Sequence, residues 1–242
     1  MRLCVLILSL YIAGCASMAQ KRPETPPSDG SVIGIMYLGD KYPKHVHVGT
    51  TALGNFERVK ASRVDYSVRM VEAIKNLMRE ENYQYVEIDG SVLPEDVQIE
   101  QFSFYTGKPK EIFKDLLISE GEKNNLDYMI VIHPIKAVAF VNSALEIHGF
   151  GLYTHCWMGN CRAEALNYQD VDIFQYPSLE TIDIWNWKAA SRRRVEGIPL
   201  GDDLKNLDES AIIKAADVFL DHFEDLTREK LVWTKFIHGE VE

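Results

Sequence analysis

The chain has 242 residues, of which 26 are basic and 36 acidic, so its formal net charge is −10. A chain of this length can bury one substantial core, and its hydrophobic fraction of 46% is typical of a globular protein. The acidic balance argues against a nucleic-acid partner, because such a partner requires a basic surface that displaces counterions from phosphates.

The first fifteen residues have the parts of a bacterial secretion signal in the usual order. Arg2 precedes an apolar run of ten residues, and the small residues Ala13 and Gly14 follow that run. Ten apolar residues are too few to cross ~30 Å of hydrocarbon, which takes about twenty in a helix. The segment Ile12-Ala13-Gly14-Cys15 resembles the lipobox of bacterial lipoproteins.

This resemblance implies that residues 1–14 are removed and that Cys15, as the new first residue, carries the lipid that anchors the protein in a bilayer. Ala16 follows, whereas an aspartate at that position retains such proteins at the inner membrane in the best-known sorting rule. The resemblance therefore implies the periplasmic face of the outer membrane, with the inner membrane as the alternative.

Residues 15–31 are rich in proline and contain almost nothing to bury, which indicates a flexible tether. We therefore expect a signal peptide at 1–14, the lipidated cysteine and tether at 15–31, and a periplasmic domain at 32–242. No internal repeat or second linker divides that domain.

Strand and helix patterns alternate through the domain. We expect strands at Val32–Leu38, Tyr85–Ile88 and Leu126–Pro134, a hairpin from His45 to Val59 around Gly54-Asn55, helices from Asp65 to Glu81 and from Pro109 to Asn125, a hairpin that pairs Arg162–Gln175 with Leu179–Ala189, and a last helix capped by Asp208. This order predicts a single α/β domain with a mixed sheet, helices packed on it, a late antiparallel hairpin and a C-terminal helix.

The helix that starts at Pro109 is expected to bury a stripe of apolar residues, namely Ile112, Phe113, Leu116 and Leu117. The stretch from Glu111 to Ile132, a helix ending in Asn-Asn before an Asp-Tyr apolar strand, resembles a unit of periplasmic α/β lipoprotein domains. That group includes the N-terminal domain of TolB, the curli secretion lipoprotein CsgG and the penicillin-binding-protein activator LpoB. The resemblance implies binding to other envelope proteins.

Three histidines are candidates for chemistry. His45 and His47 share one face of a strand and could share a metal, but no third ligand is evident nearby, so a solvent-facing pair on an edge hairpin is favoured. His133 ends the central strand, where ligands often bind in open α/β sheets. A hydrogen bond from its ring to a neighbouring turn is favoured over catalysis, because no partner can be assigned to it from sequence.

No hydrolase elbow, phosphate loop, dinucleotide-binding pattern or zinc-protease motif occurs, so no catalytic residue, cofactor or metal is predicted. Asp170, Asp172 and Asp183 belong to the predicted hairpin, whose alternation places acids on the solvent face. An enzyme with a nonstandard site near His133 and these acids remains the alternative.

Two groups are candidates for contact with a partner. Arg192, Arg193 and Arg194 form the only dense positive cluster, which suits anionic lipid headgroups or an acidic protein, or is simply a solvated strand end. Trp185 and Trp187 share one strand face, where core packing is the simplest role and an aromatic patch for a partner is the alternative.

Cys156 and Cys161 are the only cysteines after Cys15. An oxidising periplasm and a short connection with Gly-Asn favour a disulfide between them, which would fix the turn that leads into the late hairpin. The competing interpretation is a zinc site completed by His155 and His148, whose spacing fits poorly.

These observations predict a membrane-anchored envelope lipoprotein that binds another protein and helps to assemble or regulate a cell-envelope complex. The alternatives are an enzyme that acts on envelope material, and a small-ligand or metal binder that uses His45 and His47.

Overall fold

The computed structural model describes residues 27–49, 54–59, 64–102, 109–138, 146–182, 190–201, 204 and 207–240. The predictions for Cys15, Asp183, Trp185 and Trp187, and for most of the tether, lie outside these residues. Within them, no helix combines the length and the apolar character that a membrane span requires.

Strands and helices follow one another through the whole domain. The strands are β1 (Val32–Tyr37), β2 (Lys44–Val48), β3 (Phe56–Val59), β4 (Gln84–Ile88), β5 (Tyr128–Pro134), β6 (Ala137–Val138), β7 (Glu146–Ile147), β8 (Gly149–Trp157), β9 (Asn160–Gln175), β10 (Glu180–Ile182) and β11 (Ala190–Arg194). The helices are α2 (Tyr66–Glu80), α3 (Glu95–Ile99), α4 (Glu111–Asn124) and α5 (Glu209–Trp233), with a 3-10 turn η2 (Gly90–Val92). The predicted α/β domain with a late hairpin and a C-terminal helix is confirmed.

One nine-stranded sheet runs through the molecule in the order β3-β2-β8-β9-β5-β1-β4, and β10 and β11 both pair with β9. Its β4-β1-β5 part is parallel, whereas β9 runs antiparallel to β5 and to β8. The predicted mixed sheet is therefore confirmed. The pairing of β2 with β8, which is parallel, was not predicted from the sequence.

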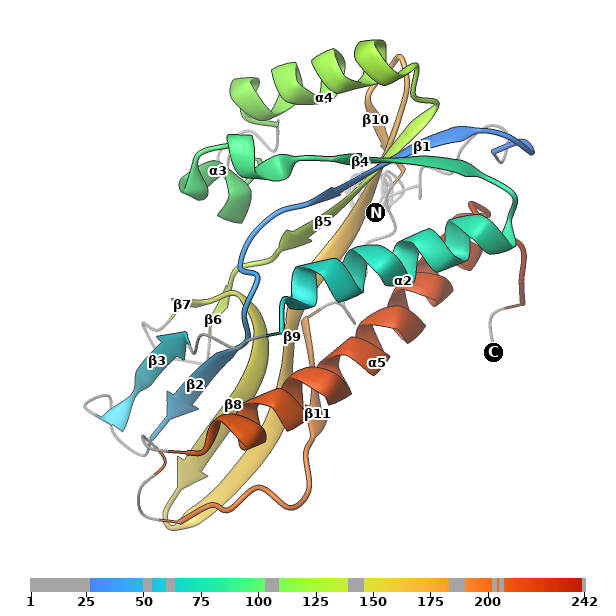
Figure 1. Ribbon diagram of the computed structural model, residues 1–242. Helices are drawn as coiled ribbons and strands as arrows, with labels where there is room; N and C mark the ends of the chain where they lie inside the picture. The colour runs from blue at the N-terminus through green and yellow to red at the C-terminus, as the bar shows by residue number, and fades with distance from the viewer. Residues whose placement is uncertain are drawn as a thin grey trace, which may run out of the picture.

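Strand β9 is the longest and connects the two halves of the sheet (Figure 1). Its residues 169–175 pair with β5, and its residues 160–168 pair with β8. The predicted hairpin is confirmed where β10 returns along β9. Strand β11 then pairs with β9 further along, opposite residues 164–168. The strand β8 was missed because its Gly-rich start weakens the strand pattern.

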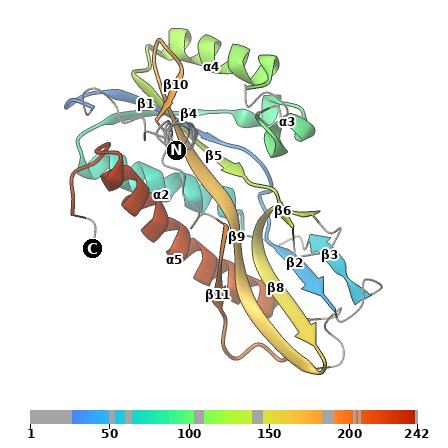
Figure 2. The same ribbon diagram turned by 180° about the vertical axis from the view of Figure 1, so that it is seen from behind.

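Helices α2 and α5 cover one face of the sheet (Figure 2). Asp65 caps α2, as predicted, by accepting a 2.9 Å hydrogen bond from the backbone N–H of Ser67. The aromatic ring of Phe219 on α5 stacks on Phe150 of β8, with ring centroids 4.8 Å apart. This face holds the larger of the apolar clusters, so burial against the sheet is what fixes both helices.

Helices α3 and α4 cover the opposite face at the parallel end of the sheet. The expected stripe of α4 is only partly right, because Phe113 and Leu117 are buried while Ile112 is 49% exposed. Pro109 also lies before the helix rather than in its first turn, since Lys110 occupies the N-cap position. The helix ends as predicted at Asn125, whose left-handed φ of 51° stops the chain from continuing.

We predict that Gly121→Ala in α4 destabilises the domain by about 1–3 kcal/mol, because a Cβ there would lie 2.0 Å from Cε1 of Tyr176. In an uncrowded helix the same change stabilises by about 1 kcal/mol. The control is Ser119→Ala at an exposed position of the same helix. Urea unfolding measures both, and a gain in stability for Gly121→Ala would show that Tyr176 does not pack on this glycine.

Candidate functional site

The hairpin between β8 and β9 ends in a two-residue turn, Met158-Gly159, which lies between the paired residues Trp157 and Asn160. Met158 has a φ of 48° and Gly159 a φ of 81°, the left-handed pair that a tight type I′ hairpin turn requires. Glycine adopts this conformation without strain, but a methionine rarely does. Backbone preference alone would therefore not place a methionine at position 158.

A disulfide joins Cys156 of β8 to Cys161 of β9 and links the two strands one residue pair before this turn. The predicted pairing is confirmed, with the Cα atoms 4.1 Å apart, the close approach of directly opposed residues on antiparallel strands. The bond does not lead into a later hairpin but crosses the end of this one. The zinc interpretation is wrong, because the two sulfurs bind each other and His148 lies eight residues from Cys156, about 25 Å along the strand direction.

Two large apolar side chains at this tip face solvent. The side chain of Trp157 is 50% exposed and that of Met158 is 77% exposed. Exposed tryptophan and methionine side chains are typical of protein-binding surfaces, where a rigid aromatic group fills a pocket of the partner. The sequence signal is Trp157-Met158 between two cysteines, but the cysteine spacing by itself indicates a disulfide loop or a zinc site and no binding surface.

The three arginines of β11 do not form one cluster. Arg192 places its guanidinium 3.8 Å from the centre of the Tyr153 ring and donates to the hydroxyl of Tyr168 at 2.8 Å. Arg193 turns to the other face of the strand, where it lies 3.6 Å from Asp225 of α5. Arg194 lies at the hairpin tip. Strand alternation turns Arg193 away from Arg192 and Arg194, so the three side chains do not share one face. A contact between Arg194 and a partner stays a prediction.

A shallow hollow of about 620 Å³ lies beside the tip, on the face of β8, β9 and β11 that carries Arg194. We call it the tip groove. It is lined by His155, Trp157, Asn160, Cys161, Arg162 and Arg194.

His133, near the end of β5, belongs to a buried ionic network and not to the tip groove. His133 Nε2 lies 3.0 Å from Asp172 Oδ2, and Lys230 Nζ lies 3.0 Å from Asp170 Oδ1. The prediction that these acids lie on the solvent face is therefore wrong, since Asp172 is 9% exposed. The side chains of His133, Asp170 and Asp172 have the ligand types and spacing of a metal site, but Lys230 already supplies a cation to it.

Both ring nitrogens of His133 face acceptors, because Nδ1 lies 3.2 Å from the carbonyl oxygen of Pro134. A neutral imidazole has only one N–H, so the charged form satisfies both contacts. Burial alone would lower the pKa of His133, but the negative charges of Asp172 and Asp170 outweigh it and raise this pKa. The ring therefore contacts a carbonyl of its own strand and a carboxylate of β9, and not a neighbouring turn as predicted.

This network has little room for a substrate. The space lined by Asp170 and Lys230 measures about 10 Å³, no more than one water molecule needs. The four side chains thus act as two ion pairs that hold α5 and β5 against β9.

His45 and His47 are also buried, with 2% and 7% of their surface exposed. The interpretation as a solvent-facing pair on an edge hairpin is wrong, because β2 lies between β3 and β8. Both rings reach the hydroxyl of Thr154 on β8, at 2.9 and 2.8 Å. A hydroxyl donates to one ring and accepts from the other, so the pair joins two strands.

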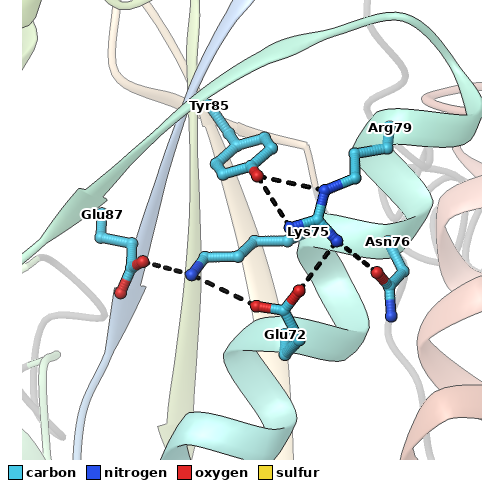
Figure 3. Close-up of polar contacts among 6 residues, drawn as sticks. All are labelled: Glu72, Lys75, Asn76, Arg79, Tyr85 and Glu87. Atoms are coloured by element: carbon cyan, nitrogen blue, oxygen red, sulfur yellow. Dashed lines mark hydrogen bonds and ion pairs between the residues drawn. The ribbon is translucent and has the colours of Figure 1, made fainter.

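A second groove of about 320 Å³ lies at the carboxyl ends of β1 and β4, beside the start of α2. Lys75 lines it, and Figure 3 shows that this lysine is held between Glu87 of β4 and Glu72 of its own helix. Arg79 adds contacts to Glu72 at 2.8 Å and to the hydroxyl of Tyr85 at 2.8 Å. These groups already neutralise one another, so the network fastens α2 to the edge strand β4 and leaves Lys75 no spare charge for a ligand.

We compared the chain with models of known protein families, with curated proteins and with solved structures, and it matches none of them. The candidate site therefore depends on geometry alone, which favours the tip groove with its exposed tryptophan over the buried histidines.

We predict that the His133–Asp172 pair makes stability depend on pH. Because folding raises the pKa of His133, its contribution is fully present below about pH 6.5, its unfolded value, and is lost as the pH rises through the higher folded value. Urea unfolding between pH 5.5 and 8.5 should show this loss for the wild type. In Asp172→Asn the NMR titration of the His133 ring should move to lower pH, and an unmoved titration would contradict the pairing.

We predict that Met158→Asn raises the free energy of unfolding by about 1 kcal/mol, because Asn-Gly suits the left-handed turn better than Met-Gly. The matched control Met158→Ala keeps the same unfavourable backbone conformation and should bring no gain. Thermal unfolding under oxidising conditions measures both variants. Equal effects of the two changes would show that backbone strain at Met158 is not the cause.

Proposed function

We propose that the protein is a noncatalytic envelope lipoprotein, anchored through Cys15, that binds another protein of a cell-envelope complex through its hairpin tip. The observation that carries the proposal is the exposed Trp157-Met158 pair on a turn that a disulfide holds rigid. A rigid aromatic anchor loses little conformational entropy on binding, which is why such residues dominate interface energies.

The shape of the molecule supports this role. Pro27, the first described residue, adjoins Tyr83 and Phe236, because the hydroxyl of Tyr83 lies 3.4 Å from the carbonyl oxygen of Pro27 and 2.9 Å from that of Phe236. These two residues follow the ends of α2 and α5. In both views those helix ends and the β8–β9 tip lie at opposite ends of the domain (Figures 1 and 2). An anchor at the first end would direct the tip away from the membrane.

Two sequence features support the location. The lipobox resemblance at Ile12 to Cys15 implies the anchor, and a disulfide between Cys156 and Cys161 fits an oxidising compartment such as the periplasm. The resemblance to periplasmic α/β lipoprotein domains implies binding to envelope proteins, and it remains a hypothesis.

The test is photo-crosslinking in intact bacterial cells, with a photoreactive amino acid in place of Trp157. We expect a discrete crosslink to an envelope protein, because the side chain at this position faces solvent at the proposed interface. The matched control places the same group at Trp233, which is 43% exposed near the opposite end. A fatty-acid label should mark the wild type, and Cys15→Ala should lose both the label and the crosslink.

Two results would contradict the proposal. One is a set of crosslinked species that is the same from both tryptophan positions. The other is a fatty-acid label that persists in Cys15→Ala, which would remove the anchor on which the orientation depends.

A further inference from the structure

The tip groove brings two arginines together on adjacent strands. Arg162 lies directly opposite His155 in the pairing of β9 with β8, and Arg194 lies opposite Glu164 in the pairing of β11 with β9. Arg162 and Arg194 are therefore diagonal neighbours on one face, with backbone positions roughly 7–8 Å apart. This spacing allows both guanidinium groups to reach one extended segment of a bound chain.

Arg162 of β9 and Arg194 of β11 differ from Arg192 and Arg193 in their contacts. Arg192 is stacked on Tyr153, and Arg193 is paired with Asp225. Neither Arg162 nor Arg194 forms an ion pair with any residue that the structure describes, and Glu164 pairs with neither. The groove thus carries two available positive charges on a chain whose net charge is −10.

The groove combines this charge with an apolar wall. Trp157 lines it alongside Arg162 and Arg194. Arginine and tryptophan are the residues most enriched at the energetic centres of protein interfaces. Arginine binds carboxylates through paired hydrogen bonds, so the natural complement is an acidic segment with an apolar residue beside its carboxylates.

Position argues against an anionic membrane as the partner. The twelve residues from Ala16 to Pro27 reach at most about 40 Å when extended. The sixteen residues of β9 alone extend roughly 50 Å, from Asn160 at the tip to Gln175. Gln175 pairs with Tyr128, whose ring contacts Phe236 at the end where Pro27 lies. A domain anchored at Cys15 cannot stand with its tip pointing into the bilayer.

We infer that the tip groove is a carboxylate-binding site for an acidic segment of a partner protein, with Arg162 and Arg194 binding its carboxylates and Trp157 covering an apolar side chain between them. The inference rests on the proposed function, because it names the chemistry of the partner at the same tip. Charge-assisted contacts of this kind weaken as salt rises, since the arginines are exposed.

The test uses the domain from Pro27 onward attached to a surface in place of its anchor, and the full lipidated chain in detergent as a second format. The probe is a fluorescent peptide of alternating glutamate and leucine, with alternating lysine and leucine as its opposite. We expect binding of the acidic peptide only, with a steep loss in salt. The double variant Arg162→Glu with Arg194→Glu should weaken it about tenfold or more.

The matched control is Lys114→Glu with Lys235→Glu, which changes the net charge equally at exposed positions away from the tip. It should bind the acidic peptide like the wild type. Equal loss in both double variants would overturn the inference, because binding would then follow net charge. So would binding to phosphatidylglycerol vesicles in preference to the peptide, or light scattering that shows self-association through the tip.

The two proposals fail separately. A cell crosslink at Trp157 without acidic-peptide binding would overturn the carboxylate site and leave the docking function. Peptide binding that depends on both arginines, with no crosslink in cells, would leave the site and remove the proposed function.

Discussion

The structure depends on the pairing of one long strand, β9, with two different neighbours. Residues 169–175 of β9 hold the parallel half of the sheet through β5, and residues 160–168 hold the hairpin half through β8. Helix α5 packs on β8 and β9, and α2, which packs on α5, covers β1 and β4 of the parallel half. The single strand makes the two halves one domain, and it also carries the hairpin tip far from the helix ends beside Pro27.

Buried charge collects where β9 changes its partner. Asp170 and Asp172 lie on the face between two apolar clusters, and His133 and Lys230 meet them there from β5 and α5. Burying a carboxylate is costly unless an opposite charge accompanies it, so these four groups tolerate burial only in this register. A slip of one residue along β9 would turn each side chain to the opposite face, and so separate Asp172 from His133 and Asp170 from Lys230.

The tip and the core follow different rules. In the core, apolar side chains are buried and polar groups are paired, as in the Thr154 bridge between His45 and His47. At the tip, a methionine occupies a left-handed position and a tryptophan half faces solvent, both of which cost stability without a local gain. A disulfide directly behind the turn compensates by restricting the unfolded chain. This division supports the proposed role of the tip as a binding element on a rigid domain.

Local pattern in the sequence determined the positions of the parallel strands and the pairing of Cys156 with Cys161. It also determined where α2 and α5 begin, at their N-caps Asp65 and Asp208. Each depends on residues close together in the chain, where periodicity, capping and turn chemistry act. The burial of His45 and His47, the partners of His133 and the groove that joins Arg162 to Arg194 were decided by tertiary structure alone. Those contacts join strands far apart in sequence, and only the register of β8, β9 and β11 sets which side chains meet, because a shift of one residue turns every side chain to the opposite face.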